Sequence, residues 1–136
     1  MKLYDLLLET TFEEFDNPST SEWRKYGHNG QYKKAISIML NFIKENLNKI
    51  DDYQLGGIYW HIGQMYAFDD NYNRAIYFMK KCGDAIEEEY KNGTIAFLKG
   101  DLNVLKKSIS NMEDGTNKDI LSSFLNSPTS KYKDIY

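Results

Sequence analysis

The chain has 136 residues, of which 41% are hydrophobic and 27% charged, and these values suit one soluble globular domain with a sizeable core. Its formal net charge is −3 and its pI about 5.4, which argues against nucleic acid as a partner because phosphate-binding proteins usually carry a basic face. The opening MKLYDLLLETTFEEF is too acidic and too interrupted for a signal peptide or a membrane span, and the single Cys82 suits a reducing compartment, so we expect a cytoplasmic protein without a membrane partner.

The first predicted helix covers Met1 to Phe15, because its apolar residues fall near one helical face. Asn17 is suited to N-cap a second, short helix, with Pro18 in its first turn. That helix is expected to end near Tyr26, where the letters GHNG favour a tight turn.

An amphipathic helix is predicted from Gln31 to Leu47, because apolar residues recur there at helical spacing. Asp51 and Asp52 can cap the next helix, which is expected to reach about Phe68. A further helix is predicted from Tyr72 to Tyr90.

The last third of the chain continues to favour helix. Asp101 can cap a helix over LNVLKKSISNM, and ILSSFL predicts one more short helix. We expect one helical domain over residues 1–125 and a mobile C-terminal tail over residues 126–136.

Two segments of the chain repeat one pattern. QYKKAISIM, from Gln31, and NYNRAIYFM, from Asn71, share Tyr, Ala, Ile and Met at matching positions, and a tyrosine precedes each copy. The shift between the copies is forty residues. Each copy follows a helix and a turn, so the pattern indicates a repeated helical hairpin.

The second copy resembles the tetratricopeptide repeat. The residues that carry the resemblance are Tyr59, Ile62, Gly63 and Tyr66 on one helix, followed by Ala75 and Met79 on the next. In the first copy, Trp23 takes the place of the glycine. A third copy that places Val104 in the alanine position lacks the glycine and the tyrosine.

The resemblance implies an all-α fold of antiparallel helical hairpins, stacked as a short right-handed superhelix of about six to eight helices. In that family, small residues such as Gly63 and Ala75 let two helix backbones approach closely. Positions one and five residues after the first aromatic face a concave groove that binds peptides. The partner-binding residues implied for this chain are Trp60 and Gln64, with Ala67 and Phe68 further along. The alternative is that Trp60 and Phe68 are covered by the chain's own terminal segments.

The titratable residues suggest no catalytic or metal site. No carboxylate, thiol or second imidazole lies one helical turn from His61, and Cys82 falls on an apolar helix face, where burial raises a thiol pKa. We therefore expect no enzyme activity, no metal and no cofactor. A weaker candidate is an acidic patch that could attract a basic partner, made of Asp84, Glu87, Glu88 and Glu89.

Three functional hypotheses remain open from the sequence. The leading one is a noncatalytic module that binds a protein or peptide in or beside a concave helical groove. The second is a bacterial immunity protein that neutralises a cognate toxin. The third is a helical protein that binds or converts a small molecule in an aromatic pocket. The sequence indicates neither the identity of the partner nor the oligomeric state.

Overall fold

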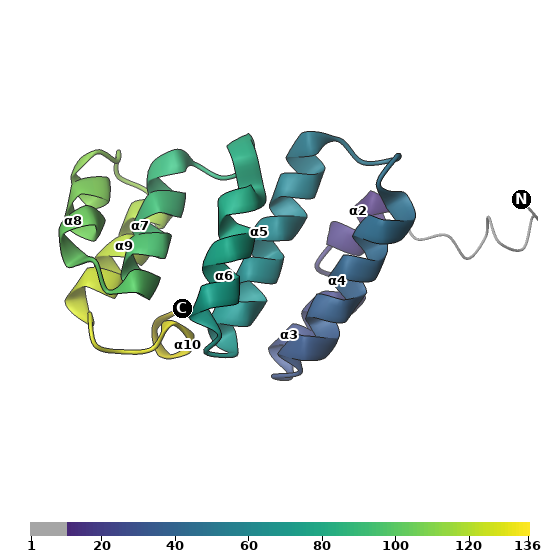
Figure 1. Ribbon diagram of the computed structural model, residues 1–136, viewed down its shortest axis with the longest axis horizontal. Coiled ribbons are helices and arrows are strands. Elements are labelled where there is room, and N and C mark those ends of the chain that lie inside the picture. The colour runs from purple at the N-terminus through teal and green to yellow at the C-terminus, as the bar shows by residue number, and fades with distance from the viewer. Residues whose placement is uncertain (1–10) are drawn as a thin grey trace, which may run out of the picture. The chain divides into compact units, whose positions relative to one another are not determined.

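The computed structural model describes residues 11–136, and every regular element in that range is helical (Figure 1). The all-α class is thus confirmed, while the superhelical stacking stays a prediction. The predicted helix over Met1 to Phe15 lies largely outside the described residues. None of the described helices is both long enough and apolar enough to cross a membrane.

The described chain forms two compact units that divide between Ile50 and Asp51, where the sequence predicts one domain. The first unit contains α2 (Phe12–Asp16), α3 (Glu22–His28) and α4 (Tyr32–Asn46). The second contains α5 (Asp52–Phe68), α6 (Tyr72–Met79), the 3-10 helix η1 (Lys80–Ala85), α7 (Glu88–Lys99), α8 (Leu102–Ser110), α9 (Thr116–Asn126) and α10 (Tyr132–Ile135).

The core of the first unit forms around Trp23. This side chain is buried, and its indole nitrogen donates a hydrogen bond to the Phe15 carbonyl oxygen at 3.0 Å. Phe15 in turn stacks on Phe42 of α4, with ring centroids 3.9 Å apart. The predicted helix start after Asn17 is wrong. The Asn17 side chain accepts from the Ser19 amide and so closes a turn, and the helix begins four residues later, at Glu22.

Three helical hairpins share one turn geometry, namely α3–α4, α5–α6 and α7–α8. In each turn an amide five residues on donates to a carbonyl in the last turn of the first helix, as in a Schellman motif. These bonds join Gln31 to Tyr26 (2.9 Å), Asn71 to Tyr66 (2.9 Å) and Asp101 to Ala96 (2.8 Å). A residue of positive φ precedes each donor: Gly30, Asp70 and Gly100. The predicted repetition of a hairpin is therefore present in the structure, with a third member.

The third hairpin corrects the predicted register. Counting from its turn, Leu105 occupies the position of Ala35 and Ala75, and Val104 does not. Gly93 then matches Gly63, so this copy does contain the glycine. A Cβ atom added at Gly93 would approach Leu121 and Ser108 too closely, so α7 also contacts its neighbours at a residue without a side chain.

The predicted long helix from Tyr72 to Tyr90 is interrupted. Gly83 has φ of 56° and ψ of −135°, outside the helical region, and Ile86 is extended. α6 therefore passes into η1, and α7 starts anew at Glu88. A glycine can adopt this conformation without the steric penalty that a side chain brings.

The α5–α6 hairpin closes at Gly63, as predicted from the small residues. A Cβ atom built at Gly63 would lie 2.6 Å from Met79 Cγ and 2.9 Å from the Ala75 carbonyl oxygen. Ala75 and Met79 have no exposed surface. The two helix backbones therefore meet with no room for a side chain between them.

We predict that Gly63→Ala lowers the free energy of unfolding by about 1–3 kcal/mol, because its methyl group would overpack against α6. Gly57 is a matched control on the same helix, since a Cβ atom there meets nothing within 4 Å. Gly57→Ala should leave the free energy of unfolding unchanged or raise it by roughly 0.5–1 kcal/mol through helix propensity. Urea unfolding of both variants measures the difference, and equal stabilities would contradict the close approach.

Candidate functional site

The four predicted groove residues of α5 do not line an open surface. Trp60 is 2% exposed, Gln64 6% and Ala67 0%, and Phe68 is partly buried. Trp60 packs against Tyr90 of α7, with ring centroids 5.6 Å apart. The assignment of these side chains to an open groove is therefore corrected. The alternative left open above, coverage by a terminal segment, holds for Phe68, which packs on Tyr132 and Tyr136, whereas Trp60 is covered by α7.

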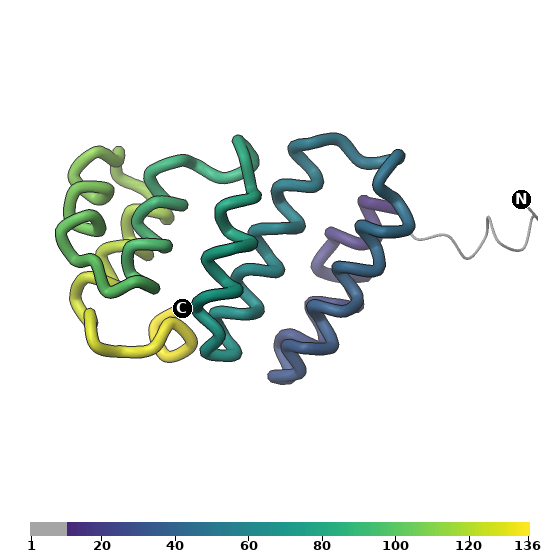
Figure 2. Tube along the Cα trace, viewed as in Figure 1, coloured from purple at the N-terminus to yellow at the C-terminus, as the bar shows by residue number. Residues whose placement is uncertain are grey.

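Residues 131–136, which we call the α10 segment, cover part of this α5 face. Figure 2 shows the chain turning back after α9, so that α10 lies beside the end of α5. Tyr132 is completely buried and belongs to the main core. The expected mobile tail thus contains a core residue. Tyr132 packs 5.1 Å from Phe68 and 5.6 Å from Phe124, measured between ring centroids.

Gln64 joins α5 to the α10 segment by hydrogen bonds. Its side-chain nitrogen donates to the Tyr132 hydroxyl at 3.4 Å and to the Tyr136 hydroxyl at 3.2 Å. Its oxygen lies 2.9 Å from His61 Nδ1. In addition, the Tyr132 amide donates to the Tyr72 hydroxyl at 3.0 Å. The buried side-chain amide of Gln64 thus forms hydrogen bonds to two tyrosines that are four residues apart.

Two tyrosines at this site have displaced pKa values. Burial raises the pKa of Tyr132 well above its ordinary value, and burial also raises the pKa of Tyr90. Both hydroxyls therefore stay neutral at physiological pH. They can donate and accept hydrogen bonds but carry no charge.

Ion pairs hold the outer edge of the α10 segment. Asp70 lies 3.1 Å from Lys133 Nζ and 3.6 Å from Lys131 Nζ. The hydrogen bond from Lys133 lowers the pKa of Asp70, and the charge of Lys131 lowers it further. Asp70 is also the turn residue with φ of 60° between α5 and α6, so the turn places this carboxylate beside the α10 segment.

Thr94 is a buried polar residue on the side of α7 that carries Tyr90. Tyr90, Thr94 and Phe97 follow one another at helical spacing, and Phe97 stacks on Phe124 at 4.4 Å. Thr94 therefore lies between Tyr90, which packs on Trp60, and Phe97, whose partner Phe124 packs on Tyr132. Its side chain has no exposed surface, and its hydroxyl has no hydrogen-bond partner.

Thr94→Val should raise the free energy of unfolding by about 1 kcal/mol, because it removes an unsatisfied buried hydroxyl and keeps the branched shape. Thr94→Ser is the matched control. It keeps the hydroxyl, deletes a buried methyl group and should destabilise by roughly 1 kcal/mol. Chemical denaturation of both variants is the measurement. A loss of stability in Thr94→Val would mean that the hydroxyl is bonded in solution.

The residues of the predicted acidic patch occupy different elements. Asp84 lies in η1, Glu87 is the N-cap residue of α7, and Glu88 and Glu89 lie in the first helical turn. Carboxylates at that end of a helix interact favourably with its dipole. Glu87 also accepts a hydrogen bond from Asn117 at 3.2 Å. In the described part of the chain, no three metal-ligating residues come together.

Cys82 has the environment expected from its sequence position. It is buried in η1, and burial raises the pKa of its thiol. A protonated and covered thiol is a poor nucleophile, so the structure offers no support for a catalytic role of this residue.

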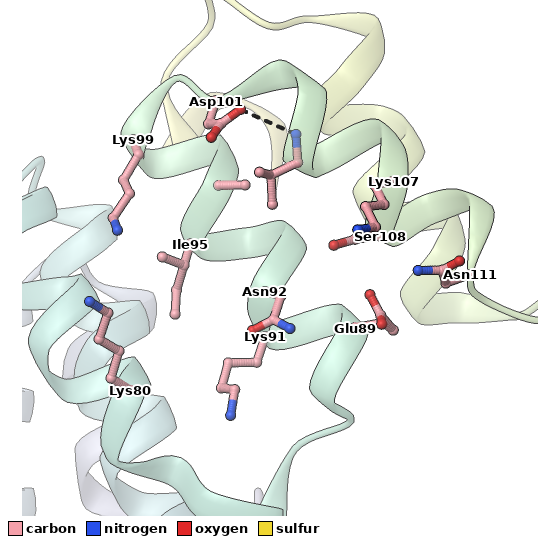
Figure 3. A pocket seen from close by; sticks show the side chains of 12 residues that line it. Lys80, Glu89, Lys91, Asn92, Ile95, Lys99, Asp101, Lys107, Ser108 and Asn111 are labelled. Atoms are coloured by element: carbon pink, nitrogen blue, oxygen red, sulfur yellow. Dashed lines mark hydrogen bonds between the residues drawn. The ribbon is translucent and has the colours of Figure 1, made fainter.

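An open groove lies between α7 and α8 (Figure 3). Its volume is about 590 Å³. Ile95, Ala96 and Val104 contribute apolar surface. The remaining lining residues are polar or charged: Lys80, Glu89, Lys91, Asn92, Lys99, Asp101, Lys107, Ser108 and Asn111.

The four lysines make this groove locally basic. Figure 3 shows Lys80 and Lys99 on one side of it and Lys107 on the α8 side. No carboxylate lies within ion-pair distance of any of the four amino groups in the part of the chain that the structure describes. Asp101 is engaged as the predicted N-cap, accepting from the Val104 amide at 3.2 Å. This surface was not predicted from the sequence, although Lys91 and Lys99 stand about two helical turns apart.

Comparison with known protein families, curated proteins and solved structures found no match to this chain. The resemblance to the tetratricopeptide repeat therefore stays an interpretation of the residues named above.

Proposed function

We propose that this chain is a noncatalytic protein-interaction module that binds an acidic stretch of a polypeptide partner in the groove between α7 and α8. The observation that carries the proposal is a set of four lysines, with no ion-pair partner among residues 11–136, around a partly apolar floor.

The charge of the groove favours an acidic occupant. The whole chain carries a formal charge of −3, so the lysines make this surface positive on a protein that is negative overall. Two carboxylates, Glu89 and Asp101, also line the groove, so four lysines less two carboxylates leave an excess of two positive charges there. Complementary charge steers a partner to such a surface and disfavours partners of the same sign.

The floor of the groove favours a polypeptide over a bare phosphate. Ile95 and Ala96 are buried in the helix interface, while Val104 is 42% exposed. An acidic segment with interspersed apolar side chains can use both the lysines and Val104. Nucleic acid would use only the lysines, and the net negative charge of the chain opposes its approach.

The test uses two synthetic peptide libraries, one of Glu and Asp interspersed with Leu and Phe, and one with Lys and Arg in place of the acids. We expect only the acidic library to bind the full chain, more weakly as salt screens the charges. Lys91→Glu and Lys107→Glu should each weaken binding about fivefold to tenfold, because attraction becomes repulsion.

Lys106→Glu is the matched control. Lys106 is next to Lys107 in α8 and is exposed, but it does not line the groove. The control changes the net charge equally, and it should bind the acidic peptides like the wild type. Equal losses in Lys106→Glu and Lys107→Glu, measured by fluorescence anisotropy, would refute a site in the groove.

A further inference from the structure

We propose that the groove between α7 and α8, which we call the lysine groove, binds an aromatic side chain of the acidic partner segment. The ring enters the place that a tyrosine of the chain itself fills in the other two hairpins. This inference rests on the function proposed above and names the residue that anchors the partner. The three hairpins differ at the positions on either side of their turns, and this difference carries the proposal.

A tyrosine and a cation meet across the first two hairpins, next to the turn. In α3–α4, Lys34 Nζ lies 4.2 Å from the centroid of the Tyr26 ring. In α5–α6, Arg74 Cζ lies 5.9 Å from the centroid of the Tyr66 ring. Both tyrosines are half-buried, and the carbonyl of each accepts the backbone bond that closes its turn. The ring therefore fills the space between the two helices at this end of the hairpin.

The second hairpin adds another ring to this space. Phe78 of α6 stacks on Tyr66, with ring centroids 5.6 Å apart, and lies 6.1 Å from the ring of Tyr59. Rings at these separations attract one another in addition to the effect of the area that they bury. The α5–α6 hairpin thus closes the gap between its helices with its own aromatic side chains.

The third hairpin has small side chains at the equivalent positions. Counting from the turns, the tyrosine, the cation and the phenylalanine are replaced by Ala96, Val104 and Ser108. All three line the lysine groove, which has a volume of about 590 Å³. Figure 3 shows Ser108 on the α8 side of this opening and Asn92 on the α7 side. The groove is therefore open where the second hairpin is filled by its own rings.

The lining of the groove favours an aromatic ring over an aliphatic side chain. Ala96 and Val104 provide apolar surface on which a ring can lie. Lysines line the same groove, and an ammonium group is attracted to the face of an aromatic ring but not to leucine. The first two hairpins already combine a ring with a cation in this way.

The partner segment is thus defined by one aromatic residue flanked by carboxylates. The ring occupies the apolar part of the groove, and the carboxylates pair with the surrounding lysines. Buried aromatic residues of this kind often contribute a large share of the binding energy at an interface.

The test varies a single residue of an acidic peptide. Four fluorescein-labelled peptides of Glu and Asp differ only in a central guest residue, which is Phe, Tyr, Leu or Ala. We expect the Phe and Tyr peptides to bind the full chain about tenfold more tightly than the Ala peptide. The Leu peptide should gain less than about threefold, because it buries apolar area without attracting the lysines.

Two variants test whether the ring binds in this groove. Ala96→Tyr copies the tyrosine of the other hairpins and should abolish the preference for Phe and Tyr, because the space is then filled. Val104→Ala removes apolar surface at an exposed position, adds no volume, and should reduce the preference at least about threefold. Asn103 is exposed on α8 and does not line the groove, so Asn103→Tyr and Asn103→Ala are the matched controls and should keep the preference.

Nuclear magnetic resonance of the isotope-labelled chain locates the ring directly. The ring current of a bound Phe or Tyr peptide should shift the methyl proton resonances of Ala96 and Val104 upfield, and the Leu peptide should not. N-acetyltyrosinamide carries a ring and no charge. It should cause the same shifts at roughly millimolar concentration, because it lacks the carboxylates that strengthen binding.

The outcomes separate this inference from the function on which it rests. Equal affinity of all four peptides, each weakened by Lys107→Glu, would overturn the aromatic anchor and leave the acidic-peptide function standing. Methyl shifts with N-acetyltyrosinamide but no binding of any acidic peptide would overturn that function and support the ring site. Neither binding nor shifts would overturn both. A preference for Phe and Tyr that survives in Ala96→Tyr and in Val104→Ala would place the ring elsewhere and refute the inference.

Discussion

The absence of a side chain at position 63 fixes how α5 packs against α6. Gly63 contacts the Ala75 carbonyl and Met79 directly, so the backbones of α5 and α6 lie close together. A rotation of α5 about its own axis would bring a side chain into this contact and cause a clash. That fixed rotation turns Trp60 and Gln64 away from α6 and toward α7 and the α10 segment. The burial of Trp60 and Gln64 therefore depends on a contact to which neither residue contributes.

Local signals in the sequence predicted local structure well. Asp51 forms the expected cap of α5, as part of a capping box with Gln54, and Asp101 caps α8. Such bonds involve residues three apart, so the sequence shows both partners at once. The interruption of the helix at Gly83 was not predicted because the apolar spacing of Tyr72, Ala75 and Met79 continues to the buried Cys82. The spacing of apolar residues indicates which face of a helix is buried, but it does not show where the backbone leaves the helical conformation.

Burial of the predicted site depended on residues far along the chain. Trp60 lies under Tyr90, thirty residues away, and Gln64 bonds to Tyr132 and Tyr136, about seventy residues away. No helical pattern within α5 shows whether a distant segment returns to cover it. The lysine groove has the same origin, since Lys80, Lys91 and Lys107 come from three elements. The third hairpin was misaligned because its spacing from the second is thirty residues, whereas the first two copies are forty apart.

The two tryptophans of this chain are divided between its two units. Trp23 is buried beside Phe15 in the first unit, and Trp60 is buried beside Tyr90 in the second. Tryptophan fluorescence therefore has one emitter in each unit. A chain with phenylalanine at either position would report the unfolding of one unit alone, so the two units can be ranked in stability without an added label.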